Sequence, residues 1–143
     1  MPRWLKAVLI VTLIVVLFVV GVVVVGGIWF YRNKDALRAR ARAIGTEGKE
    51  FGKTTDNQGC VDEAVKRYKK DPGFLAAVAN QGFLDACLKA SRPTIGFCES
   101  IPLGDFAKMQ EWQESQCKRY DLRSSLDCQT LFMSVPMFCP DRK

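Results

Sequence analysis

The chain has 143 residues, carries a net charge of +6, and contains six cysteines but no histidine. This length accommodates one small domain beside a membrane anchor. Without histidine, a Cys–His nucleophile and His-ligated metal sites are excluded, and the sequence contains no cofactor fingerprint. We therefore expect no catalytic residue, no cofactor and no bound metal, and we interpret the chain as a non-enzyme.

Residues 1–6 are predicted to form a short N-terminal tail, and residues 7–31 a transmembrane helix. The only polar side chain in this run before Tyr31 is Thr12. A helix of these 25 residues is about 37 Å long, which exceeds the ~30 Å hydrocarbon core of a bilayer. The run is also longer than the apolar region of a cleaved signal peptide, so it predicts an uncleaved signal anchor.

Aromatic and basic side chains flank the apolar run, as is typical of a membrane interface. We assign to the interface Trp4, Trp29, Tyr31, Arg32, Lys34, Arg38, Arg40 and Arg42. Residues 1–55 hold nine basic and three acidic side chains, whereas residues 56–143 hold twelve of each. The excess positive charge therefore favours contact with anionic lipid and gives no reason to expect nucleic acid. A purely topogenic flank is the simpler interpretation of the same residues.

Residues 32–59 are expected to form a basic juxtamembrane stem that is partly helical. Its first part, residues 35–43, has high helix propensity. Three glycines are expected to loosen the rest of the stem: Gly45, Gly48 and Gly52. Phe51 is interpreted as an incidental apolar residue, and residues 54–59 as a loop and helix cap.

A cysteine-rich helical domain is predicted over residues 60–143. Its first helix is expected at residues 60–70, where Val61, Val65 and Tyr68 recur on one face, and its second at residues 72–90. Between these helices, Asp71 is expected to cap the second helix and Pro72 to occupy its first position. The apolar face of the second helix is predicted to comprise Phe74, Leu75, Val78, Phe83, Leu84, Cys87 and Leu88.

The short connection between these two helices predicts an antiparallel hairpin. Cys60 and Cys87 then lie at nearly the same height along it, close enough for a disulfide. We predict that these two cysteines pair and that Cys98, Cys117, Cys128 and Cys139 share two further bridges. Sequence alone does not select among the pairings of the last four.

The second half of the domain is expected to begin with an irregular segment, residues 91–102. A third helix is predicted at residues 105–120, with Phe106, Met109 and Trp112 near one face. A fourth is predicted to begin at Ser124, in a capping-box variant with Asp127, and to close at Pro136. No period-2 strand pattern is present, so we predict an all-α chain: one transmembrane helix and a small, disulfide-bridged domain of about four helices.

The cysteines and the basic flank give opposite indications of orientation. The five basic residues after the apolar run place the C-terminal side in the cytoplasm by the positive-inside rule. Six cysteines without a Cys-x-x-Cys pair indicate disulfides and an oxidising compartment. We give the cysteines more weight and expect a single-pass protein of the bacterial inner membrane with its C-terminal domain in the periplasm.

The layout resembles a group of bacterial envelope proteins that have an N-terminal anchor, a basic stem and a cysteine-rich helical domain. The residues that carry the resemblance are 1–31 and the segment Cys-Leu-Lys-Ala-Ser-Arg-Pro-Thr-Ile-Gly-Phe-Cys at 87–98. The resemblance implies a membrane-anchored architecture and brings no activity with it.

Three classes of function are weighed against these features. The first, which we favour, is an interaction or structural module that binds an envelope protein, as an accessory subunit of a membrane complex. The alternatives are a small-ligand-binding helical bundle, which an aromatic pocket would support, and a thiol-redox protein, which the absence of a Cys-x-x-Cys pair disfavours.

Overall fold

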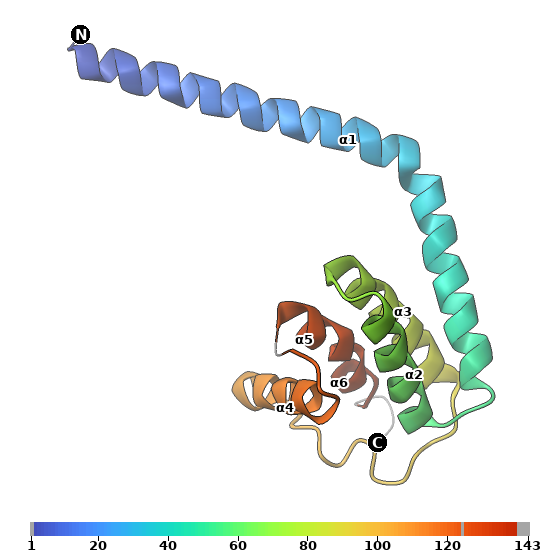
Figure 1. The fold of residues 1–143 in the computed structure, drawn as a ribbon. Helices are drawn as coiled ribbons and strands as arrows, with labels where there is room; N and C mark the ends of the chain where they lie inside the picture. The colour runs from blue at the N-terminus through green and yellow to red at the C-terminus, as the bar shows by residue number, and fades with distance from the viewer. Residues whose placement is uncertain (1, 124, 140–143) are drawn as a thin grey trace. The chain divides into compact units, whose positions relative to one another are not determined.

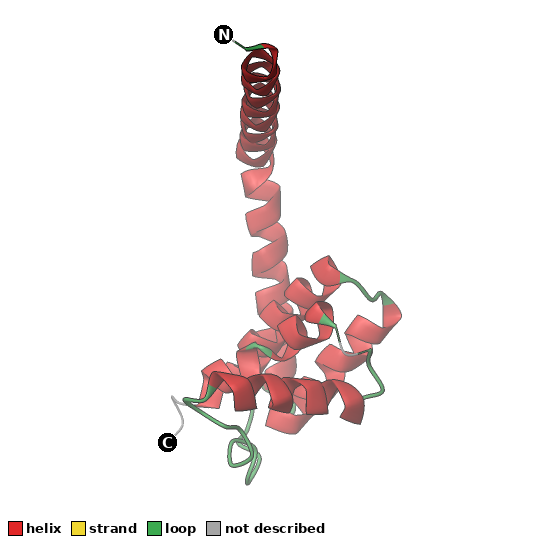
Figure 2. Cartoon of the chain, turned by 90° about the vertical axis from the view of Figure 1, so that its left-hand side faces the viewer, coloured by secondary structure: helices red, strands yellow, loops and turns green. Residues whose placement is uncertain are grey.

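The computed structural model describes residues 2–123 and 125–139, and every regular element in them is a helix (Figures 1 and 2). The helices are α1 (Arg3–Gly52), α2 (Asn57–Lys70), α3 (Phe74–Ala90), α4 (Phe106–Arg119), α5 (Leu126–Phe132) and α6 (Ser134–Phe138). The chain divides into two compact units, Met1–Ala39 and Arg40–Lys143. The all-α prediction, with one long apolar N-terminal helix and disulfides in the remainder, is confirmed.

The first unit is the N-terminal part of α1. Within the described residues, α1 is the one helix long and apolar enough to cross a membrane. The large apolar side chains from Val8 to Tyr31 are exposed, and the hydroxyl of Thr12 donates to the carbonyl oxygen of Val8 at 2.9 Å. The helix thus satisfies its own polar groups, as a span in lipid must.

The second unit begins with the last part of α1, which corrects the expected stem. The helix continues through all three glycines to Gly52, and Ile44 and Phe51 pack against the buried core. The ring of Phe51 lies 5.9 Å from that of Phe83. The compact unit therefore starts at Arg40 rather than at Cys60, and Phe51 has a packing role.

Helices α2 and α3 form the predicted hairpin, although the turn between them differs from the prediction. Asp56 caps α2, its carboxylate accepting from the backbone N–H of Gly59 at 2.9 Å. Asp71 is the C-cap of α2, and Gly73, at φ 153°, precedes the first residue of α3. A positive φ is strained for any residue with a Cβ, so the turn depends on Gly73, and Pro72 lies outside the helix.

The core centres on α3, which packs against α2, α5 and α6. Phe83, Leu84 and Leu88 are completely buried with Leu131 of α5. Helix α4 packs on α5, and the carboxylate of Asp105 caps it by accepting from the N–H of Lys108. Phe106, expected on the apolar face of α4, is instead 79% exposed.

The C-terminal helices also differ from the prediction. Ser125 caps α5 by accepting from the N–H of Cys128; the predicted cap Ser124 lies outside the described residues. Pro136 does not end the last helix but lies inside α6, at its third residue. The first turn of a helix tolerates proline because its N–H groups have no partner within the helix.

Three disulfides join the cysteines of the second unit. They link Cys60 to Cys87, Cys98 to Cys139, and Cys117 to Cys128, with Cα–Cα distances of 5.8, 5.5 and 6.1 Å. The predicted Cys60–Cys87 pair and the two bridges among the other four are confirmed. No free cysteine is present in the described residues.

Candidate functional site

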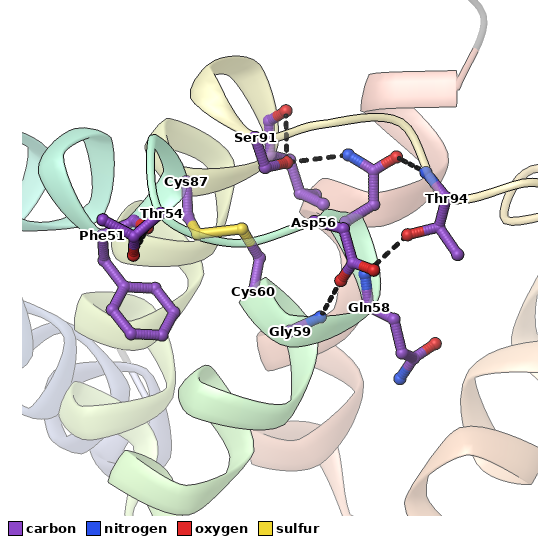
Figure 3. Close-up of a disulfide and its surroundings, with 11 residues drawn as sticks. Phe51, Thr54, Asp56, Gln58, Gly59, Cys60, Cys87, Ser91 and Thr94 are labelled. Carbon is purple, nitrogen blue, oxygen red and sulfur yellow. Dashed lines mark hydrogen bonds between the residues drawn. A yellow bond between two sulfur atoms is a disulfide. The ribbon is translucent and has the colours of Figure 1, made fainter.

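The irregular segment after α3 is fastened to the start of α2, as Figure 3 shows beside the Cys60–Cys87 bridge. The fastening residue is Asn57, only 3% exposed. Its amide nitrogen donates to Ser91 Oγ at 2.8 Å, and its amide oxygen accepts from the N–H of Thr94 at 3.0 Å. The N–H of Gln58 in turn donates to Thr94 Oγ1 at 3.2 Å. This end of the segment is therefore held in one conformation.

A cleft of about 190 Å³ lies beside this fastened segment. Its walls come from the start of α2, the irregular segment, α4 and the α5–α6 region, and they include Gln58, Phe97, Trp112, Arg119, Tyr120 and Phe132. Among the described residues of this lining, Arg119 is the one charged side chain. The cleft thus combines aromatic rings with polar side chains, and it has positive charge at one edge.

Tyr120 is held by hydrogen bonds and by stacking. Its phenol oxygen donates to Asp62 Oδ1 and accepts from Gln58 Nε2, both at 2.7 Å. Its ring stacks on Phe132, with ring centroids 5.9 Å apart. Burial, and then the hydrogen bond to the Asp62 carboxylate, raise the pKa of Tyr120 to about 12. At neutral pH the phenol is a fixed hydrogen-bond donor and not a base.

Trp112 forms another wall of the cleft. Its ring meets Phe132 edge-on, with centroids 6.5 Å apart. Its indole Nε1 is buried and has no hydrogen-bond partner among the described residues. The aromatic wall is therefore rigid, because each of its rings is packed against another.

Ile95 lies at the rim of the cleft and is fully exposed. Asn57 fixes the chain just before it through Thr94, and the Cys98–Cys139 bridge fixes the chain just after it. A large apolar side chain is thus held in water beside an aromatic hollow. Its fixed position beside the aromatic rings, and not its exposure alone, makes Ile95 a candidate anchor for binding.

The predicted cysteine sites are all disulfides, and the predicted interface residues belong mostly to the first unit. Within it Trp4, Trp29, Tyr31, Arg32 and Arg38 are exposed, and the Lys34 ammonium lies 4.0 Å from the centroid of the Tyr31 ring. Arg40 and Arg42 are exposed in the second unit. In the described part of the chain, no three metal-binding side chains cluster.

The sequence did not indicate the cleft. Its residues come from four separate segments, and the segment that includes Ile95 has no regular pattern. The signal that was present is an Asn at the start of a helix and a Ser-x-x-Thr that begins 34 residues later, each able to bond to backbone groups.

These features define a class of protein: a small, disulfide-bridged helical domain that follows a candidate membrane-spanning helix. Comparison extends this description no further, because no family model, no curated protein and no solved structure matches the chain.

Proposed function

We propose that the chain is a membrane-anchored binding module whose cleft receives an apolar side chain of a protein partner. The observation that carries the proposal is Ile95, fully exposed at the rim of a rigid aromatic cleft. An interface gains most of its affinity from a few anchors in well-packed pockets. Holding such groups in one conformation before binding lowers the entropic cost of association.

The size of the cleft favours a protein partner over a free small molecule. Small-molecule sites usually enclose about 300–1,000 Å³, whereas this cleft encloses about 190 Å³. That volume suits a single side chain. Because the described lining places aromatic rings beside Arg119, the partner side chain that we propose is apolar and has a carboxylate next to it.

The disulfides support a location outside the cytoplasm. All six cysteines are paired, and such bridges persist in oxidising compartments. We therefore assign the domain to the periplasmic side of a bacterial inner membrane, with α1 as an uncleaved anchor. A C-terminal fluorescent reporter that matures only in the cytoplasm should stay dark, and a C-terminal phosphatase that requires oxidation should be active. The reverse pattern would overturn this orientation.

The binding role is tested by site-specific photocrosslinking of the full chain in its native membrane. A benzophenone amino acid at position 95 should give a discrete protein adduct, and the same group at Gln110, exposed on α4 but outside the cleft, should not. Adding the Arg119→Glu substitution should weaken the adduct at position 95. Equal adducts at both positions, or none at position 95, would contradict the proposal.

A further inference from the structure

Three apolar side chains at the start of α3 are exposed, although the sequence predicted them to be part of its apolar face. Phe74 is 52% exposed, Leu75 82% and Val78 44%. Their spacing places them on one side of the helix, away from the buried Ala77. A group of neighbouring apolar side chains exposed to water is typical of a surface that binds a protein or a membrane.

Two lysines lie directly before this apolar group. Lys69 and Lys70 are the last residues of α2 and are exposed, and neither forms an ion pair within the described residues. Only Asp71 carries a negative charge in the turn that follows. We name Lys69, Lys70, Phe74, Leu75 and Val78 together the basic–apolar tip.

The packing of α1 on α3 shows at which end of the second unit this tip lies. A Cβ at Gly48 would meet the carbonyl oxygen of Phe83, and one at Gly52 would meet that of Cys87. From the first contact to the second, the chain advances by four residues on α1 and by four on α3, so the two helices run parallel. Each residue of α1 in this region lies level with the residue of α3 that is 35 positions later in the chain. The same offset places Arg40 level with Leu75.

The basic–apolar tip therefore lies at the end of the unit where the chain arrives from the anchor. Arg40 and Arg42, both exposed, are at this same end. Arg40 lies only nine positions after Tyr31, which is a path of about 14 Å along a helix. The tether thus keeps the tip at high effective concentration near the bilayer surface.

We propose that the basic–apolar tip binds the anionic headgroup layer of the bilayer that holds the anchor. The lysines match anionic headgroups, and the apolar side chains match the boundary between headgroups and acyl chains. The inference rests on the membrane anchoring proposed above. We choose lipid over an acidic protein partner, because the covalent connection to the anchor always keeps the bilayer surface close to the tip.

The test uses the full chain in nanodiscs and a fluorinated phenylalanine as the reporter. It is placed at Leu75 in one sample and, as a matched control, at Ile95, which is also strongly exposed but lies near the opposite end of the α2–α3 hairpin. A paramagnetic headgroup lipid should broaden the signal at position 75 at least several-fold more than that at position 95. The difference should require phosphatidylglycerol in the nanodisc and shrink in a Lys69→Glu/Lys70→Glu variant.

Equal broadening at the two positions, or broadening that ignores phosphatidylglycerol and the lysine substitutions, would overturn the proposal. If position 75 were covered in cells but showed no broadening by lipid in nanodiscs, its partner would be an acidic protein, and the proposal would be overturned as well. Anchoring is measured separately, by whether the chain stays in alkali-washed membranes. A chain that stays there without tip contact refutes the tip alone, whereas release refutes the anchoring.

Discussion

Both parts of α1 contain glycines, but the glycines of the two parts meet different surroundings. In the first part, a Cβ at Gly21, Gly26 or Gly27 would have no neighbour within 4 Å. In the second part, a Cβ at Gly48 or Gly52 would come within 2.4 or 2.5 Å of a carbonyl oxygen on α3. Glycine lowers helix propensity at all five positions, yet at two of them it permits two helix backbones to pack closely. The role of a helical glycine is thus decided by what it faces.

The largest expected effect comes from removing covalent ties, which only the second region has. The Cys98→Ala/Cys139→Ala variant opens a separation of 41 residues, and the Cys117→Ala/Cys128→Ala variant one of 11. Loop-closure entropy predicts losses of about 4 and about 3 kcal/mol in the free energy of unfolding. Chemical denaturation of the full chain in detergent measures both. Helicity of the apolar segment should persist, and an equal or reversed order would contradict the entropic account.

Alanine substitutions test the glycine comparison directly. Gly48→Ala and Gly52→Ala should each lower the free energy of unfolding by about 2 kcal/mol, because backbone atoms cannot yield to the new Cβ. Gly45→Ala is the matched control in the same segment: its Cβ would meet nothing within 4 Å, so it should stabilise by up to about 1 kcal/mol. Gly26→Ala should leave the domain unchanged. Thermal unfolding gives all four values, and a neutral Gly48→Ala would refute the close packing.

Tyr120→Phe removes the phenol that joins Asp62 and Gln58 but keeps the ring on Phe132. We expect a loss of about 1–2 kcal/mol, typical of hydrogen bonds to a charged group. Because the pKa of Tyr120 is raised to about 12, from an ordinary value of about 10, this stabilisation is complete below about pH 10. It is lost as the pH rises through about 12. Ultraviolet titration should show one tyrosine ionising near pH 12 that is absent from the variant.

The smallest expected effect concerns the ion pair between Glu47 and Arg67, which joins α1 to α2. The hydrogen bond from Arg67 lowers the pKa of the Glu47 carboxyl, so its contribution is present above the ordinary pKa and disappears as the pH falls through the lowered value. Glu47 is more than half exposed, so Glu47→Gln should cost only about 0.5 kcal/mol at neutral pH. Glu50→Gln, which breaks an exposed pair with Lys53 directly after α1, is the control and should cause no measurable change.

The sequence was sufficient where local pattern and geometry agree. Val61, Val65 and Tyr68 were predicted on one face of a helix and are buried. A short turn between two helices was enough to pair Cys60 with Cys87, because the two cysteines lie at similar distances from that turn. These features depend on helix periodicity and rise, which residues encode locally.

The sequence was insufficient where contacts between residues far apart in the chain decide the structure. Gly48 and Gly52 indicated a flexible stem, because the α3 carbonyl groups that they contact lie more than 30 residues later in the sequence. Phe74 and Leu75 looked like core because α3 is apolar on nearly every side, so its pattern does not say which side is covered. The cleft near Ile95 depends on four segments meeting, which no single motif encodes.

For a domain that is exported as proposed above, the order of the bridges along the chain has a consequence for how the protein is oxidised. Cys60 and Cys87 appear first and are native partners, so pairing in order of appearance gives the correct bridge. The next cysteine, Cys98, has to stay unpaired until Cys117 and Cys128 have appeared, because its partner Cys139 is the last to appear. A strictly sequential oxidase would join Cys98 to Cys117. We therefore expect the second half of the domain, and not the first, to require a disulfide isomerase.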